Sequence, residues 1–223
     1  MLNIVIGYDT TVPVLAHTAM HSLLEKSSKP IKFHLLNQMN MQEIWKRPRG
    51  EFDSTQFSNS RFLVPYLYDY EGWTLFVDND VIFQEDPAAL FELCDDQYAV
   101  MCVKHNQVVK SDKKFRGRKQ TAYNYKNWSS LMLFNNPKCK SLTLDYVNTA
   151  PGLDLHQFKW TQSDLIGDIP LSWNYLVENE NQTDEKPKML HYTNGAPCYP
   201  ETQSCQYSEI WHSTFNDLMN CRF

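Results

Sequence analysis

The stretch LFVDNDVIF at residues 75–83 sets two carboxylates, Asp78 and Asp80, between two apolar runs. The first run predicts a strand buried on both faces of a sheet. Because an unpaired carboxylate is costly to bury, Asp78 and Asp80 are predicted to mark the strand's end, where two hard oxygen ligands suit Mg²⁺ or Mn²⁺. A turn between two strands is the less favoured alternative, since the apolar run resumes at Val81 and no Gly or Pro follows before Pro87.

The composition limits the class of protein. The 223 residues suffice for one ordinary to large domain, and a hydrophobic fraction of 42% supplies a sizeable core. A formal net charge of −5 disfavours a nucleic-acid partner. The six cysteines show no CxxC spacing, so a zinc site is not indicated. There is no secretory signal and no apolar run near the ~18 residues of a membrane span, which favours a cytoplasmic protein without a transmembrane segment.

The first part of the chain predicts a strand–helix–strand unit. Residues 3–8 (NIVIGY) are typical of a buried strand, and Pro13 is a favoured residue for the start of a helix. The stretch 27–30 (SSKP) ends this helix, and residues 31–37 (IKFHLLN) form a second predicted strand. Such an order predicts a right-handed parallel unit.

The remaining patterns extend this α/β arrangement. Pro65 would have to lie in the first turn of its predicted helix or kink it. Asp86 is the expected N-cap of the helix that follows it. Because the chain shows no repeat or linker, residues 1–223 are predicted to form a single domain. We expect helices at 61–68, 87–93, 137–147 and 208–219, and strands at 98–103, 130–135 and 189–192.

Two other strand ends carry polar groups. His191 closes the last predicted strand before a Gly/Pro loop, and Gly7-Tyr8-Asp9 closes the first, where a nucleotide could dock. Asp78, Asp80 and His191 together are a candidate Mn²⁺ site, because Mn²⁺ accepts imidazole more readily than Mg²⁺ does. A histidine in such a place is more often a hydrogen-bonded structural residue, and only its combination with the Asp motif favours the metal role.

These features resemble the GT-A nucleotide-sugar glycosyltransferases, and within them the retaining glycosyltransferase family 8, from Ile4 to Pro197. The resemblance implies a GT-A (Rossmann-like) α/β fold with a mixed, mostly parallel central sheet flanked by helices. It also implies a hexosyltransferase that uses Mn²⁺ or Mg²⁺ and a UDP-sugar donor, UDP-glucose or UDP-galactose. The hexose would pass to a glycan or another hydroxyl acceptor with retention.

The resemblance also implies roles on the nucleotide side. The stretch from Gly7 to Asp9 matches the residues that read the nucleobase in the family. Arg61 lies 17 residues before Asp78, as in family members, where this arginine is associated with the donor phosphates and the sugar. It is therefore a predicted donor-binding and catalytic residue. Asn79 is a candidate for a contact with the ribose.

The metal ligands and the diphosphate loop follow from the same resemblance. Asp78 and Asp80 match the family's first two metal ligands, and His191 matches the third. Asn194 and Gly195 belong to a variant of the loop that contacts the diphosphate in the family.

This chain departs from the family pattern in two places. The loop at residues 191–198 is one residue longer before its Gly and lacks the family's lysine, so backbone N–H groups around Gly195, or Lys104, are expected to meet the phosphates. The family's Asp-Gln pair near the reacting sugar is not clearly kept. Gln162 and Asp164 occupy that region and are predicted catalytic residues, with Asp164 contacting the sugar.

Two further patterns have alternative interpretations. The basic run from Lys110 to Lys119 is either a solvated surface loop, which we favour slightly, or a mobile basic flap near an anionic ligand. Trp128, Trp160 and Trp173 could form an acceptor platform, or they could pack in the core, which we favour for Trp173.

Three rival functions fit parts of the sequence. A haloacid-dehalogenase-type phosphatase would use Asp78 and Asp80, but its motif usually opens the domain. A catalytically silent module that binds a nucleotide sugar or a glycan would explain the altered loop and the missing lysine. A nucleotidyltransferase would need a Gly-rich basic loop after the first strand, and residues 7–11 do not resemble one.

Overall fold

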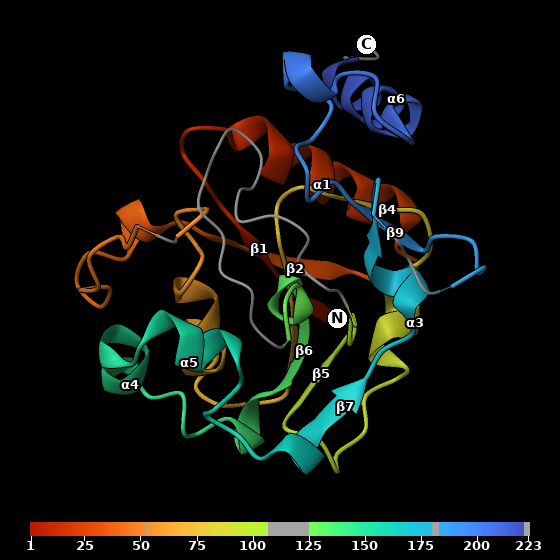
Figure 1. The fold of residues 1–223 in the computed structure, drawn as a ribbon. Helices are drawn as coiled ribbons and strands as arrows, with labels where there is room; N and C mark the ends of the chain where they lie inside the picture. The colour runs from red at the N-terminus through yellow and green to blue at the C-terminus, as the bar shows by residue number, and fades with distance from the viewer. Residues whose placement is uncertain (52, 107–124, 180–182, 221–223) are drawn as a thin grey trace.

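The computed structural model describes residues 1–51, 53–106, 125–179 and 183–220. Its centre is a six-stranded sheet in the order β2-β1-β3-β6-β5-β7, with helices packed around it (Figure 1). A smaller sheet has the order β4-β9-β8. No helix in the described ranges has both the length and the apolar character that a membrane span requires.

The first strands and helix form the predicted parallel unit. Strand β1 (Leu2–Gly7) pairs in parallel with β2 (Ile31–Leu36) and β3 (Trp73–Val77). Helix α1 (Pro13–Lys26) begins with proline in its first turn, where the missing N–H costs no helical hydrogen bond. The strand–helix–strand prediction is therefore confirmed.

One reversed strand makes the sheet mixed. Strand β6 (Leu131–Asn135) runs antiparallel to both β3 and β5 (Val100–Cys102), and β7 (Ile166–Asp168) is parallel to β5. All strands except β6 therefore point the same way. We call the edge where β1, β3, β5 and β7 end, and where β6 begins, the carboxyl edge, and the opposite one the amino edge.

The smaller sheet continues the chain directly beyond β3. Strand β4 (Val81–Phe83) pairs antiparallel with β9 (Met189–His191), which is parallel to β8 (Tyr175–Leu176). Helix α6 (Ser208–Met219) lies beside α1 (Figure 1). This sheet brings the end of β9 next to the residues that follow β3.

The main sheet is buried on both faces. Ile4 and Leu75 pack on one face against α1, and Val5 and Phe76 pack on the other, all with no exposed surface. Helices α4 (Leu144–Thr149) and α5 (Gly152–His156) supply apolar side chains to that second face. Burial on both faces explains why the strands are continuous apolar runs in the sequence.

The predicted helix at 137–147 is wrong in extent. Only α4 is α-helical there, because the Thr143 side chain accepts a hydrogen bond from the Tyr146 N–H and starts a new helix after a turn. The helix expected at 61–68 is a 3₁₀ turn that continues into α2 (Val64–Leu67), and that expected at 87–93 is α3 (Ala88–Phe91). Among the described residues, the 3₁₀ segments are Gln38–Asn40, Ser60–Leu63, Trp128–Ser130, Asn136–Lys138, Ser163–Leu165, Leu171–Asn174 and Pro200–Thr202.

Candidate metal centre

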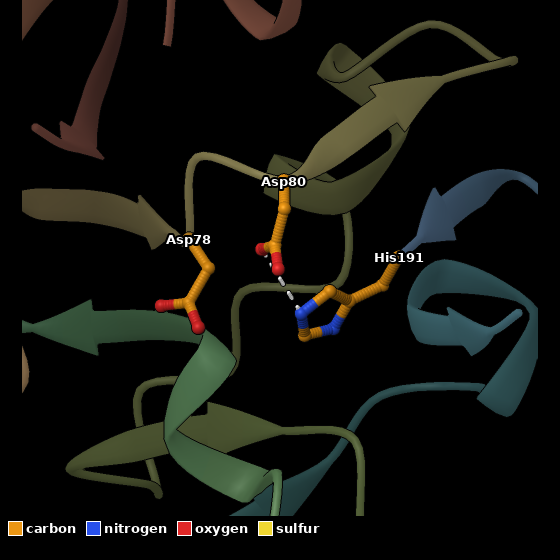
Figure 2. Close-up of side chains that lie close together, drawn as sticks. All are labelled: Asp78, Asp80 and His191. Carbon is orange, nitrogen blue, oxygen red and sulfur yellow. Dashed lines mark ion pairs between the residues drawn. The ribbon is translucent and has the colours of Figure 1, made fainter. Parts of the chain in front are cut away.

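Asp78, Asp80 and His191 converge at the carboxyl edge. Asp78 follows β3, Asp80 precedes β4 and His191 ends β9, and their ligand atoms all lie within 4.8 Å of one another. Figure 2 shows the His191 ring facing the Asp80 carboxylate, with Nε2 3.2 Å from Oδ1. The backbone fixes this approach, because His191 pairs with Val81 in the small sheet.

These three side chains fit a divalent cation. Two carboxylates and one imidazole form a donor set of the kind that Mn²⁺ and related ions accept. The two acidic groups are half-buried and the imidazole is buried, so a bound ion would exchange part of its water shell for protein ligands. The predicted ligands are thus placed together, although His191 lies more than 110 residues from the two aspartates in the chain.

A buried arginine balances the charge of Asp78. Arg61 is 4% exposed, and its Nη1 lies 2.7 Å from Asp78 Oδ1 and donates to the Ser129 carbonyl at 2.8 Å. Its guanidinium carbon also lies 5.3 and 5.1 Å from the ring centroids of Phe57 and Phe76, within the range of a cation–π contact. Arg61 was predicted to contact the donor, but its contacts here orient the first predicted metal ligand.

A cleft opens beside the three side chains, with a volume of about 130 Å³. Its lining includes three carboxylates and, among the described residues, no lysine or arginine. An anionic ligand would therefore need a bound cation to enter it. The lining residues are Asp9, Thr11, Val12, Leu15, Ser54, Thr55, Asp78, Asn79, Asp80, Asn127, His191, Thr193, Gly195, Ala196 and Tyr199.

The end of β1 forms one wall of the cleft through Asp9. Its Oδ1 accepts hydrogen bonds from the N–H and the hydroxyl of Thr11, at 3.0 and 2.6 Å, and its Oδ2 accepts from the Gln56 N–H at 3.2 Å. Gln56 in turn bonds Thr10 through its side-chain amide. Asp9 thus ties the segment that carries Ser54 and Thr55 to the end of β1.

Asn79 offers a free donor to this cleft. The residue is 3% exposed, and among the described residues its Nδ2 has no hydrogen-bond partner. Because buried amide groups are normally paired, an unpaired one in a cleft lining indicates a position for a ligand's acceptor atom.

Besides Arg61, three residues predicted to bind the donor do not line the cleft. Gly7 is covered by the Phe57 ring, which would lie 2.4 Å from a Cβ at that position, so glycine is needed there for packing. Tyr8 packs edge-on against His17 at 5.9 Å. Asn194 is exposed to solvent, whereas its neighbours Thr193 and Gly195 line the cleft.

Two predicted catalytic residues lie at the wrong edge of the sheet. Gln162 and Asp164 are exposed and precede β7, which runs parallel to β3. They therefore sit at the amino edge, and β7 is three strand spacings from β3, or about 14 Å. The structure does not bring them to Asp78, so we leave both out of the proposed site.

The other predicted positions also have structural partners. The Lys104 Nζ donates to the Ile166 carbonyl at 2.8 Å and pairs with Asp168 at 3.1 Å, so it is not directed to a phosphate in this structure. Trp128 and Trp160 are 8% and 6% exposed and pack in the core, as does Trp173 at 2%. The whole basic run at 110–119 lies outside the described residues.

Sequence reasoning missed several polar residues around His191. The side-chain oxygen of Asn174 lies 2.8 Å from Nδ1 of the His191 ring, within hydrogen-bond distance. Asn174 Nδ2 donates a hydrogen bond to the Ser130 hydroxyl at 2.9 Å. His105 bonds the Asn174 backbone, and burial together with the nearby His191 lowers the pKa of His105 to about 4, so its ring is neutral at physiological pH. The sequence does place polar residues next to apolar runs, for example Ser130 directly before β6. It does not reveal which of these polar residues contact one another in the fold.

The comparisons with known proteins bear on both family and fold. No family model matches the chain. The chain is 40% identical over 218 residues to Protein CDI of Arabidopsis thaliana, covering 94% of this chain and 84% of that protein. This chain belongs to the Protein CDI family. That name states no activity.

The solved structures show the fold. The galactosyltransferase LgtC, solved with donor and acceptor sugar analogues, matches with a TM-score of 0.63 at 13% identity, over 99% of this chain and 98% of that one. The glycosyltransferase GlyE of Streptococcus pneumoniae TIGR4 matches with 0.62 at 17% identity, over 99% and 63%. The bifunctional glycosyltransferase WbbM matches with 0.65 at 13% identity, and this chain spans about half (49%) of its length. The predicted GT-A fold is confirmed.

Proposed function

We propose that this protein is a metal-dependent glycosyltransferase that moves a hexose from a UDP-sugar, UDP-glucose or UDP-galactose, to a glycan or another hydroxyl acceptor with retention. One observation carries the proposal: Asp78, Asp80 and His191 converge beside a cleft at the carboxyl edge of a GT-A fold. Ligands of open α/β sheets bind at this edge. The whole chain, residues 1–223, would serve as one catalytic domain.

Different residues of the cleft would bind the metal, the ribose and the phosphates. Asp78, Asp80 and His191 would hold Mn²⁺ or Mg²⁺, which when bound stabilises the charge on a departing diphosphate. Asn79 offers its unpaired amide to the ribose or a phosphate. The Thr193 hydroxyl accepts a hydrogen bond from Asn179 at 3.1 Å and keeps its own proton for a phosphate oxygen.

The nucleobase would meet the wall at the end of β1. Asp9 and Thr11 line this wall, and their mutual hydrogen bonds hold it rigid before any ligand arrives. The backbone N–H of Gly195 was predicted to contact the phosphates, but it already donates a hydrogen bond to the Tyr192 carbonyl at 2.9 Å. Gly195 therefore shapes the loop, with a φ of 113° that favours glycine.

The charge of the cleft supports a strict need for metal. Its described lining carries three carboxylates and no lysine or arginine, and Arg61 is already paired with Asp78. A nucleoside diphosphate would be repelled by this lining unless a cation were bound first or together with it.

The silent binding module remains a second candidate, because the missing loop lysine removes a group expected to assist the leaving diphosphate. The phosphatase receives no such support. Its first aspartate would have to attack a phosphorus atom, whereas Asp78 is held by Arg61 at 2.7 Å. The nucleotidyltransferase gains no support either, since no lysine or arginine among the described residues lines the cleft.

The test combines binding and turnover. We expect UDP to raise the melting temperature only with Mn²⁺, because the carboxylates of the cleft repel the diphosphate when no cation is bound. The shift should be large, since a ligand at 100 times its Kd adds about 2.7 kcal/mol to stability. We also expect UDP release from UDP-glucose or UDP-galactose with Mn²⁺, and Asp80→Asn as the matched control should lose both responses. Binding without any release would favour the silent module, and no response to any nucleotide would refute the proposal.

A further inference from the structure

A short chain of buried hydrogen bonds determines how His191 is oriented. The Ser130 hydroxyl donates to the Asn127 carbonyl at 2.7 Å, so Ser130 Oγ must accept the bond from Asn174 Nδ2 at 2.9 Å. The opposite orientation of the Asn174 amide would turn its oxygen toward the Asn127 carbonyl, 3.5 Å away, and place two acceptors together. The network therefore aims Asn174 Oδ1 at His191 Nδ1, at 2.8 Å.

This orientation decides the tautomer of His191. An amide oxygen only accepts, so Nδ1 must carry the hydrogen and, in the neutral ring, Nε2 is left with a lone pair. That lone pair faces Asp80 Oδ1 at 3.2 Å. Two acceptors at this distance repel each other unless a proton or a metal cation lies between them. In the neutral ring Nε2 has no hydrogen, so it is free to bind a metal ion together with Asp80.

Burial makes the arrangement rigid. Asn174 has no exposed surface, and Ser130 and His191 are each 3% exposed. Solvent therefore cannot replace a lost partner in this network, and an unsatisfied group here costs stability. Asn174 itself does not line the cleft, so it can act there only through His191.

We propose that Asn174 is a positioning residue that holds His191 in the Nδ1–H tautomer and so presents Nε2 as a ready metal ligand. The inference rests on the proposed function for its metal. Second partners of this kind orient metal-bound histidines in many proteins, and their loss weakens metal binding about 10–100-fold.

The first test reads the tautomer directly, without metal. Long-range ¹H–¹⁵N NMR spectra of the His191 ring at pH 9 should show hydrogen on Nδ1 and a bare Nε2 in the native protein. In Asn174→Leu, which removes the acceptor, the Nε2–H form should become the major one. A native ring protonated on Nε2, or an unchanged tautomer in Asn174→Leu, would overturn the inference.

The second test measures Mn²⁺ affinity by electron paramagnetic resonance. Asn174→Leu should weaken binding about 10–100-fold, while Asn174→Asp, which keeps an acceptor facing Nδ1, should recover most of it. Ser130→Ala is a milder change should Asn174→Leu fail to fold, and it should weaken binding in the same direction. Native affinity in the folded Leu or Ala variant would refute the role. Native protein that binds no Mn²⁺ would instead refute the metal in the proposed function, and the NMR result would still decide the tautomer.

Discussion

The two edges of the main sheet carry similar residues and differ in what they can do. At the carboxyl edge, Asp78 follows β3 and meets Arg61, Asp80 and His191. At the amino edge, Asp164 precedes β7 as an exposed carboxylate. Both aspartates adjoin buried strands, but strand direction sends one to the cleft and the other away from it. The comparison teaches that, on the strands of the main sheet that run in the direction of β3, a carboxylate must follow its strand to reach this site.

The largest expected effect is at the carboxyl edge. Asp78→Asn or Asp80→Asn should lower metal-dependent UDP release by at least about 100-fold, because each removes a charged ligand from the candidate site. The circular dichroism spectrum should stay native. Full activity in either variant, measured with saturating Mn²⁺, would mean that the substituted aspartate is not a required metal ligand, and the two edges would then not differ in function.

A large effect on stability is expected for the arginine behind the site. Arg61→Ala should lower the free energy of unfolding by about 3–5 kcal/mol, because it leaves the partly buried Asp78 carboxylate without its charged partner. Urea denaturation measures this loss.

The matched control for Arg61 is the exposed ion pair between Lys159 and Asp154, at 2.6 Å. Lys159→Ala should cost less than about 1 kcal/mol, because solvent screens such a pair. Equal losses in the two variants would mean that burial does not set the value of the Arg61 pair.

A moderate effect is expected at the end of β1. Gly7→Ala should destabilise the protein by about 1–3 kcal/mol, since the new methyl group would overlap the buried Phe57 ring. Gly50→Ala, whose nearest neighbour would be an Asp53 side-chain atom at 3.5 Å, should stay within about 0.5 kcal/mol. A folded Gly7→Ala with normal stability and impaired nucleotide binding would restore the predicted nucleotide role of Gly7.

The smallest effect is expected at the amino edge. Asp164→Asn should change the rate of UDP release and the Mn²⁺ affinity by less than about twofold, because an exposed surface carboxylate far from the cleft adds little to either. A loss comparable with that of Asp80→Asn would show that the chain rearranges to bring Asp164 to the donor, and the contrast between the edges would fail.

Local patterns predicted most strands because each is a run of apolar residues buried on both faces. The same patterns located Asp78 at the end of β3 and His191 at the end of β9. Asp80 lies in the bend that joins β3 to β4, so the less favoured interpretation, a turn between two strands, also describes this segment. The patterns failed for the helix at 137–147, where one threonine cap divides the segment. They also did not reveal that the small size of Gly7 makes room for the Phe57 ring.

The sequence by itself determined the α/β class, most of the strands and the identity of the three converging side chains, because these depend on residue type and on short-range periodicity. Only the tertiary structure decided that Arg61 pairs with Asp78, that Asn174 orients His191, and that Asp164 lies at the far edge. Each of these depends on strand direction and register between segments distant in the chain, which pairing in the folded sheet sets and no local pattern records.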